Sequence, residues 1–498
     1  MNPLYGLALL GAYFTILILV SNRTARGETS SDTFFVANRS SKWYLVAFGM
    51  IGTSLSGITF ISVPGMVRDS NLHYLQMVLG YLIGYGVIAN VLMPLYYRLQ
   101  LVSIYTYLEQ RFGFWAYKTG AGFFLISRLL GSSARFYLVL SVLHLAIFTH
   151  FHIPFWASVG IGLLLIWVYT WKGGMKTIIV TDTLQTFCML LAVVISIAYI
   201  QGEVALKGDS LMNFVLENPL AKVWNTDPVS PMFWVKQILA GAFIAITMTG
   251  LDQDMMQKNL TCRSLEEAKK NMYWFSGILL IVNALFLVLG LLLYAYAAQE
   301  QIAVPAKSDQ LFPLLALQHF PTWLGLLFLT GIIAATYAST DSALAALTTS
   351  FCFDFLNFSS RTESDRLQKK FQVHLGMSML VWVVVLLFHQ YNENSLIVTV
   401  FELAGITYGP LLGLYACGLY SSIRPKDTLI PFIAVFSSVF SYLLKTNSKA
   451  WFGGYAIGFE ILLINGFTTF LLLFLSSFWQ REPSDKGGIG HESLKNLT

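Results

Sequence analysis

Long apolar runs separated by short polar segments recur from one end of the chain to the other. Runs of about 20 apolar residues have the length of membrane-spanning helices. The pattern predicts thirteen such spans, and an odd number places the two chain ends on opposite sides of a bilayer. The predicted spans are 3–20, 43–67, 73–98, 117–148, 153–171, 178–201, 231–257, 271–298, 322–356, 373–390, 395–420, 428–445 and 455–479.

The composition supports an all-α polytopic membrane protein. Of the 498 residues, 56% are hydrophobic and 11% are charged, whereas about a quarter of the residues of a soluble globular protein are charged. An outer-membrane barrel would show alternating segments of about ten residues, and none are visible. The four cysteines and eight histidines show neither a disulfide framework nor zinc-site spacing. We therefore expect a lipid bilayer as the surroundings, no nucleic acid partner and no organic cofactor.

Lysine and arginine are distributed unevenly between the two sides of the predicted bundle. One alternating set of loops holds 22 of the 31 basic residues and the other set holds seven, while Arg128 and Arg135 fall within a span. The positive-inside rule then places the N-terminus outside and the C-terminus in the cytoplasm, as in a multi-pass protein of the plasma (inner) membrane. The first apolar run lacks a basic region and a cleavage signal, so we interpret it as a retained span.

Two spans contain stretches that weaken a helix, IGTSLSGITFISVPG at 51–65 and GAFIAITMTGLDQD at 241–254. Such stretches free backbone carbonyls, which is tolerated at membrane depth only where the backbone is buried in protein or lines a wet cavity. Each one begins a set of five spans, and the second set is inverted because the first crosses the membrane an odd number of times. This pattern predicts an inverted-repeat transporter with its site at the two breaks. The alternative is that both stretches are small-residue packing faces.

The predicted organisation follows from these repeats. It consists of an accessory first helix at 1–22, a first five-helix repeat at 43–201, an external loop at 202–230, a second inverted repeat at 231–420, two accessory helices at 428–479 and a cytoplasmic tail at 480–498.

The span at 322–356 carries an unusual polar stretch, GIIAATYASTDSALAALTTS. Residues three, four and seven apart share a helix face, so Ala335, Ala338, Ser339 and Ser342 form one stripe with Asp341 at its edge. Hydroxyl, carbonyl and carboxylate oxygens suit a small hard cation. The alternative is that the hydroxyls bond back to the preceding turn.

The ionisable residues within predicted spans include four candidates, Arg135, Asp182, Asp252 and Asp341, whereas Glu402 and Glu460 lie nearer span ends. A charge at the bilayer centre costs about 2.5–3.5 kcal/mol on insertion scales, so it usually faces a partner or a cavity. These residues are candidates for a functional site. Alternatively, Arg135 pairs with Asp182 or Asp252 and only holds helices together.

Several of these stretches resemble motifs of the sodium:solute symporter family. The segment AATYASTDSALAALTTSFCFDF resembles the family's AAxxSSxxSxLxxxSSxxxxD stretch, and SLSGITFISVPG resembles its first broken helix. KGGMKTIIVTDTLQ resembles its GGxxAVxxTDxxQ helix, and DQDMMQKNLTCRSLEEAKK resembles its NQxxxQRxxxxxxxxxAxK loop. The likeness covers about 43–425 and implies a LeuT-like core of ten helices in two inverted repeats.

The resemblance also implies two sodium sites. The principal site maps to backbone carbonyls of Gly52, Leu55 and Ala335 and to side-chain positions Ala338 and Ser339. Because Ala338 departs from the family's usual serine, one hydroxyl ligand is missing unless Thr340 or water replaces it. A second sodium site, used by some members, maps to Asp182, Asp341 and Ser342, where the two carboxylates could also hold a proton.

The implied solute site lies between the two breaks, with Ser54, Ser56, Thr59 and Asp252 facing it. Arg135 corresponds to the arginine that grips the carboxylate in sialic-acid-transporting members, a task that suits its planar fork. We therefore interpret the chain as a monomeric sodium-coupled symporter that imports a carboxylate such as sialic acid by alternating access. The alternatives are sodium- or proton-coupled symport of a neutral sugar, polyol or amino acid. A membrane-embedded enzyme would need a nucleophile–histidine or metal motif, which the sequence lacks.

Overall fold

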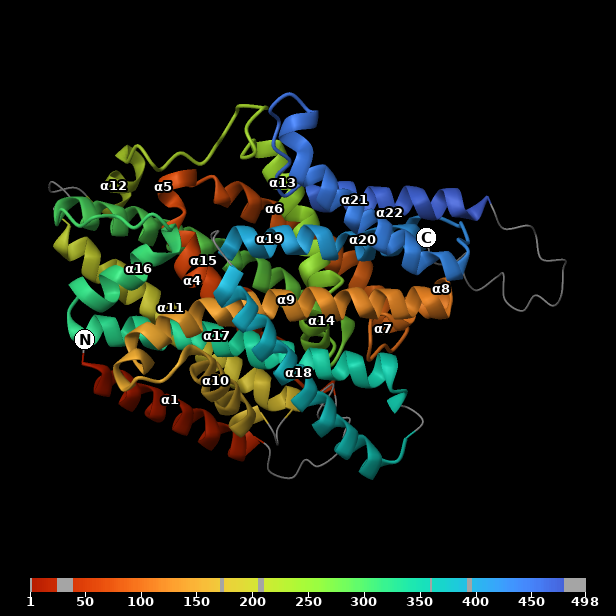
Figure 1. Cartoon of the computed structure of the whole chain (residues 1–498), viewed down its shortest axis with the longest axis horizontal. Helices are drawn as coiled ribbons and strands as arrows, with labels where there is room; N and C mark the ends of the chain where they lie inside the picture. Colours follow the sequence, from red (N-terminus) through yellow and green to blue (C-terminus); the bar gives the residue numbers. More distant parts are fainter. Residues whose placement is uncertain are drawn as a thin grey trace.

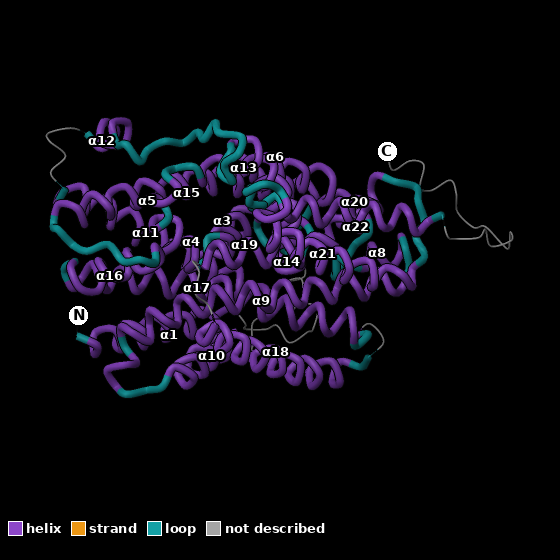
Figure 2. Tube along the Cα trace, turned by 45° about the horizontal axis from the view of Figure 1, so that its top comes forward, coloured by secondary structure: helices purple, strands orange, loops and turns teal. Residues whose placement is uncertain are grey.

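The computed structural model describes residues 2–24, 39–170, 174–204, 210–358, 361–391 and 396–478. Helices account for the regular structure of these residues, and no strand occurs among them. Figures 1 and 2 show most of the helices running alongside one another along the long axis of the molecule. The prediction of an all-α protein is confirmed.

The first predicted repeat begins with an interrupted helix, as expected, and is preceded by one accessory helix. Its elements are α1 (Pro3–Thr24), α3 (Trp43–Ser54), α4 (Gly57–Gly65), α5 (Val67–Ser70), α6 (Tyr74–Val87), α7 (Met93–Arg98), α8 (Thr106–Arg111), α9 (Phe114–Ala146), α10 (Phe155–Thr170) and α11 (Gly174–Glu203).

The second predicted repeat follows the same order and is followed by two accessory helices. Its elements are α13 (Trp234–Ala245), α14 (Gln253–Asn259), α15 (Leu265–Gln299), α16 (Leu311–Leu314), α17 (Thr322–Ser350), α18 (Glu363–Tyr391), α19 (Leu396–Thr407), α20 (Gly409–Tyr420), α21 (Ile430–Trp451) and α22 (Ile461–Ser477).

The number of spans depends on how bent and short helices are counted. Among the described residues, eight helices are long and apolar enough to cross a membrane, and eleven spans result if each of three bent helix pairs is one span. The apolar helices α10 and α22 are shorter, with 16 and 17 residues. At 1.5 Å per residue they fall somewhat short of a hydrocarbon layer about 30 Å thick. The count of thirteen therefore stays a prediction.

Both predicted interruptions are present as sharp bends. The axes of α3 and α4 differ by 57°, and the helix that ends at Gly250 differs from α14 by 70°. Ser56 and Asp252, which precede α4 and α14, have extended backbone conformations. These conformations end one helix and start the next in a new direction.

A third bend, of 44° between α19 and α20, was not expected, because the span 395–420 is predicted as one continuous helix. Pro410 lies at the start of α20. Proline has no backbone N–H, so Pro410 cannot donate to the carbonyl of Ile406, which instead accepts a hydrogen bond from Asn465 Nδ2 at 2.7 Å. The bend lies at this gap in the helical bonding.

The predicted external loop at 202–230 contains a short helix, α12 (Leu211–Glu217). The carbonyl of Lys222 accepts a hydrogen bond from the backbone N–H of Leu72 at 3.2 Å, and the carbonyl of Val223 accepts one from Gln76 Nε2 at 2.7 Å. The loop therefore packs on the start of α6. Residues 205–209 of this loop and the predicted tail at 480–498 lie outside the described residues.

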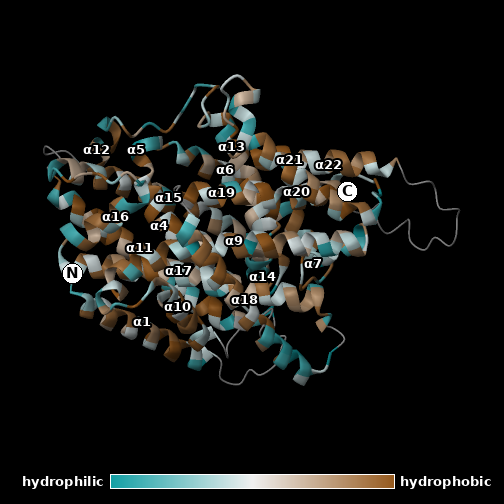
Figure 3. Ribbon diagram, viewed as in Figure 1, coloured by the Kyte–Doolittle hydropathy of each residue, from teal (hydrophilic) through white to brown (hydrophobic). Residues whose placement is uncertain are grey.

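The helix with the polar stretch lies in the interior of the bundle. Every residue of α17 from Gly331 to Ser350 is buried, and Figure 1 shows α17 between α9, α10 and α11. In Figure 3 the hydrophilic residues gather mainly in loops and at helix ends, such as the start of α18. The hydroxyls of α17 therefore face protein rather than lipid.

The closest helix contact made through glycine joins α6 to α13. A Cβ atom at Gly80 would overlap the carbonyl oxygen of Ile238, and one at Gly241 would overlap the carbonyl oxygen of Met77. Small residues let two backbones approach in this way within a membrane.

We expect Gly80→Ala to lower the melting temperature of the detergent-purified protein by several degrees, because the added methyl group forces α6 away from α13. Gly86→Ala is the matched control, since a Cβ there meets no atom within 4 Å and alanine favours the helix. Equal melting temperatures for the two variants would contradict the close contact.

Candidate ion and solute site

The first break lies directly against α17. The hydroxyl of Thr53 donates a hydrogen bond to the carbonyl of Ala338 at 3.3 Å. One turn further on, a Cβ atom at Gly57 would overlap the side-chain oxygen of Thr336. The backbone from Gly52 to Gly57 therefore runs beside the part of α17 that carries the predicted sodium ligands.

The bend leaves carbonyl oxygens without backbone partners. The N–H of Leu55 donates to the carbonyl of Ile51 at 2.7 Å, and helical bonding resumes with Phe60 N–H to the carbonyl of Ser56 at 3.1 Å. Within the described part of the chain, no hydrogen bond ends on the carbonyl oxygens of Gly52 or Leu55. Freed carbonyl dipoles of this kind can replace the hydration shell of an alkali ion.

The facing surface of α17 offers fewer oxygens than the family pattern. Ala338 has no side-chain oxygen, and the hydroxyl of Ser339 donates to the carbonyl of Thr336 at 2.9 Å. The hydroxyl of Ser339 therefore bonds to a carbonyl of the preceding turn, as in the alternative considered in the sequence analysis. A hydroxyl oxygen keeps acceptor lone pairs after donating its proton, so this bond is compatible with an ion on the other side. The structure thus places the first break beside α17 at Thr336 and Ala338, and the principal sodium site stays a prediction.

The predicted second sodium site is arranged differently. Asp182 Oδ2 lies 2.5 Å from Lys258 Nζ and 3.2 Å from Thr53 Oγ1. The hydroxyl of Ser342 donates to a carboxylate of α14, Asp254. Two of the three predicted ligands are therefore engaged by other groups.

Asp341, the third predicted ligand, also has partners. Its Oδ2 accepts a hydrogen bond from the hydroxyl of Tyr169 at 2.6 Å, and its Oδ1 accepts one from the backbone N–H of Ser342 at 2.5 Å. The side chain is 1% exposed. The carboxylate is held between α10 and α17.

The position of Lys258 is a correction, because this residue is one of the 22 basic residues predicted to lie in the loops on the cytoplasmic side. Lys258 belongs to α14 and its side chain is 1% exposed. The predicted span 231–257 ends one residue before Lys258, so Lys258 was assigned to the following loop. The 70° bend before Asp252 directs it back into the bundle.

Arg128, which the sequence analysis placed in a span without a role, is the partner of two buried carboxylates. Its guanidinium forms an ion pair with Asp254 and lies 3.6 Å from Asp252 Oδ2. Because Asp254 also accepts from Ser342, this group connects α9, α14 and α17. Arg128 and Arg135 are seven residues apart and therefore share one face of α9. This spacing could have indicated that Arg128 also points into the bundle.

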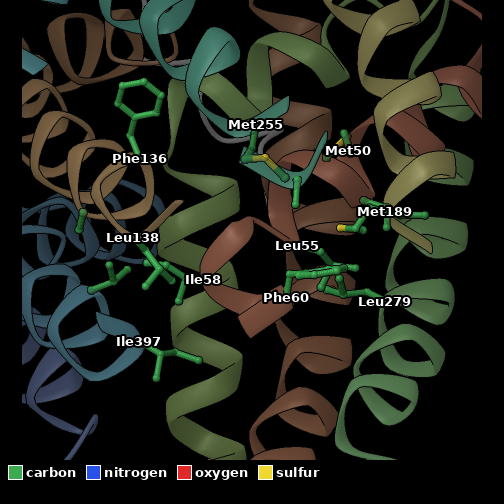
Figure 4. Close-up of a cluster of buried hydrophobic side chains, with 14 of the residues drawn as sticks. Met50, Leu55, Ile58, Phe60, Phe136, Leu138, Met189, Met255, Leu279 and Ile397 are labelled. Carbon is green, nitrogen blue, oxygen red and sulfur yellow. The ribbon is translucent and has the colours of Figure 1, made fainter. Parts of the chain in front are cut away.

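A cavity opens at the first break, and four of the five predicted solute-binding residues line it: Ser54, Ser56, Thr59 and Arg135. The rest of its wall is largely aromatic and aliphatic, with a few polar groups. Figure 4 shows Leu55, Ile58, Met255, Leu279 and Ile397 gathered around the break from four segments of the chain. The aromatic wall residues are Tyr74, Tyr81, Tyr85 and Phe401.

Asp252, the fifth predicted solute-binding residue, is not among the lining residues. Its Oδ1 accepts hydrogen bonds from the backbone N–H groups of Asp254 and Met255 at 3.0 and 3.2 Å. Its Oδ2 accepts one from the hydroxyl of Tyr408 at 2.5 Å. The carboxylate therefore caps α14 and ties it to the bend between α19 and α20.

Arg135 is half-buried on the cavity wall. In the described part of the chain no carboxylate lies within ion-pair distance of it. The two partners considered for a purely structural role are engaged elsewhere, Asp182 by Lys258 and Asp252 by Arg128. The guanidinium is thus available to a group in the cavity.

Comparisons with known proteins agree with this geometry. A model of the sodium:solute symporter family matches residues 34–420. A putative sodium-dependent multivitamin transporter of Drosophila melanogaster is 26% identical over 439 residues, with 83% of this chain and 72% of the relative covered. The sodium/sialic acid symporter NanT of Aliivibrio fischeri is 24% identical over 476 residues, with 92% and 91% covered.

A solved structure of a sodium-coupled sialic acid symporter in a substrate-bound, outward-open state superposes with a TM-score of 0.79. It is 19% identical and covers 96% of this chain and 98% of its own, so it establishes the fold. The family model spans most of the sequence, including both breaks and α17. The chain belongs to the sodium:solute symporter family, whose members are transporters rather than enzymes.

Proposed function

We propose that the protein is a sodium-coupled symporter that imports a small organic carboxylate, with sialic acid as the best single candidate. The observation that carries the proposal is the packing of the first break on α17. There, the hydroxyl of Thr53 lies 3.3 Å from the carbonyl of Ala338 on α17, and the carbonyls of Gly52 and Leu55 on either side of Thr53 have no hydrogen-bond partner among the described residues. The coupling ion is sodium, held at the principal site by these oxygens and the hydroxyl of Ser339.

The carboxylate assignment rests on Arg135. A guanidinium that is half-buried in a cavity, with no internal carboxylate partner among the described residues, favours an anionic ligand. The hydroxyls of Ser54, Ser56 and Thr59 line the same cavity and suit a solute with several hydroxyl groups. The similarity to the sialic acid symporter of Aliivibrio fischeri supports the same class.

Coupling follows from the shared break. Sodium contacts the carbonyls of Gly52 and Leu55, while the solute contacts Ser54 and Ser56 on the same turn. Each ligand then orders the backbone that the other needs, and each raises the affinity for the other. The inside-negative potential adds about 2.3 kcal/mol per charge per 100 mV.

Alternating access would then come from rocking of the two repeats around the fixed site. In this proposal the N-terminus lies outside, the C-terminus lies in the cytoplasm, and one chain is the working unit. A neutral sugar or polyol remains the alternative solute class, since the cavity hydroxyls alone would bind it.

The direct test uses purified protein in liposomes. We expect radiolabelled N-acetylneuraminate to accumulate under an inward sodium gradient and not under an equal choline gradient. Uptake that persists without sodium and collapses with the pH gradient would instead identify proton coupling. Uptake of a neutral sugar alone would exclude the carboxylate assignment.

We expect Ser339→Ala to raise the sodium concentration for half-maximal uptake by about tenfold, a loss of about 1.4 kcal/mol, because one ion ligand is removed. Thr330→Ala is the matched control. Its hydroxyl bonds back to Leu326 on the same helix at 2.9 Å and lies outside the site. An unchanged sodium dependence in Ser339→Ala would remove Ser339 from the ion site.

We expect Arg135→Ala to reduce carboxylate uptake at least a hundredfold while sodium-induced thermal stabilisation persists, since the ion site is separate. Arg135→Lys should restore only a minor part of the uptake, because an ammonium keeps the charge but not the bidentate fork. Full uptake by Arg135→Ala would show that the solute does not bind through this residue.

A further inference from the structure

Asn283 places a hydrogen-bond acceptor without a partner in the wall of the cavity at the first break. The residue belongs to α15 and is 1% exposed, and it lines the same cavity as Ser54 and Arg135. Its Nδ2 donates a hydrogen bond to the carbonyl of Leu279, one turn earlier, at 2.8 Å. Its Oδ1 is buried and has no hydrogen-bond partner among the described residues.

The orientation of this amide follows from its bond to Leu279. A carbonyl oxygen can only accept, so the NH₂ end of Asn283 faces its own helix and the oxygen is the free end. Buried polar atoms nearly always have a partner, and leaving one unpaired costs free energy. An unpaired acceptor in a cavity wall therefore points to a ligand that supplies a donor.

The packing of α15 fixes the direction in which Asn283 faces. Phe275, two turns earlier, packs edge-on against Tyr85 of α6, with ring centroids 5.0 Å apart. Phe286, one turn later, packs edge-on against Phe60 of α4, with centroids 5.9 Å apart. Positions 275, 283 and 286 lie on one helix face. Asn283 thus faces the junction of α4 and α6, beside the first break.

The polar groups of the cavity differ in what they offer a solute. The Arg135 guanidinium is a donor only, and the hydroxyls of Ser54 and Ser56 can donate or accept. Asn283 Oδ1 is an acceptor without charge. An unsubstituted carboxylate supplies acceptors alone, so it can satisfy Arg135 but leaves Asn283 unpaired. An acid that also carries hydroxyl or amide N–H groups can satisfy both.

We propose that Asn283 is a specificity residue, which selects acids bearing a hydroxyl or amide N–H donor and disfavours unsubstituted monocarboxylates. The inference rests on the proposed carboxylate symport and narrows its substrate class. A site that bonds a hydroxyl of its substrate rejects an analogue without that hydroxyl, because the buried acceptor stays unpaired. The bond to Leu279 already holds the amide in place, so little side-chain freedom is lost on binding.

The test compares two acids of equal chain length, gluconate with hydroxyl groups and hexanoate without them. Their dissociation constants are measured by calorimetry on the purified protein in sodium chloride. We expect the wild-type chain to prefer gluconate, and Asn283→Leu to reduce this preference by about tenfold to a hundredfold, because the unpaired acceptor is gone. Asn283→Ala removes the same acceptor without adding bulk and should have the same effect.

Asn447→Leu is the matched control. The amide of Asn447 makes the same bond to the carbonyl one turn earlier, that of Leu443, at 2.8 Å. Asn447 belongs to α21 and is not among the residues that line the cavity. Its replacement should leave the preference between the two acids at the wild-type value.

A stability measurement separates recognition from a purely structural role. Replacing an unpaired buried acceptor by an apolar group of similar volume should leave the melting temperature without solute equal to or above that of the wild-type protein. A fall of several degrees in Asn283→Leu, or a failure of both Asn283 variants to fold, would assign Asn283 to the fold and overturn the proposal.

The binding outcomes distinguish this proposal from the proposed function. An unchanged preference in folded Asn283→Leu and Asn283→Ala, or equal binding of the two acids by the wild-type chain, would overturn the role of Asn283 and leave carboxylate symport intact. If the wild-type chain binds neither of these acids nor N-acetylneuraminate in sodium chloride, the proposed function itself is contradicted, and the specificity assignment with it.

Discussion

The constraint on which this structure depends is that a backbone carbonyl freed inside the hydrocarbon layer must find a partner within the protein. The breaks after α3 and before α14 free such groups. Burial against protein is the arrangement that makes them tolerable at this depth. The first break therefore lies against α17, the helix with buried hydroxyls. At the second break, the carbonyls of Gly250 and Leu251 accept hydrogen bonds from the hydroxyls of Tyr96 and Tyr105 at 2.8 and 3.0 Å. The carbonyls of the second break thus have side-chain partners, while those of Gly52 and Leu55 at the first have none among the described residues.

Buried charges then connect the helices around these breaks. Lys258 joins α14 to α11, and Arg128 joins α9 to two carboxylates at the start of α14. Removing one partner of a buried pair typically costs 3–5 kcal/mol, so each of these contacts constrains where α14 can lie. Helices of the first repeat are thereby fixed to α14, a short helix of seven residues in the second.

The sequence predicted best those features that hydropathy and helix-breaking residues express directly. The stretch at 51–65 contains Gly, Ser and Pro, which weaken a continuous apolar helix, and a bend occurs there. Ser54, Ser56, Thr59 and Arg135 were placed at the solute site from that break and from the family resemblance, and they line one cavity. Features that depend on how a short polar segment folds back were missed. Hydropathy assigned Lys258 to a loop. The partners of Arg128, Asp252 and Asp254, could not be identified without knowing the position of α14. The bend at Tyr408 depends on the local effect of Pro410, which average hydropathy hides.

The capping of α14 by Asp252 also bears on how an anion can be recognised. The first N–H groups of a helix carry partial positive charge and attract anions. Here a carboxylate of the chain itself already accepts from two of these groups. For the proposed carboxylate solute, this helix end offers no free N–H groups at Asp254 and Met255, so recognition of the acid would rest on the side chain of Arg135 in the cavity wall. A substitution of this one residue could then change the selectivity without a change in the helix arrangement.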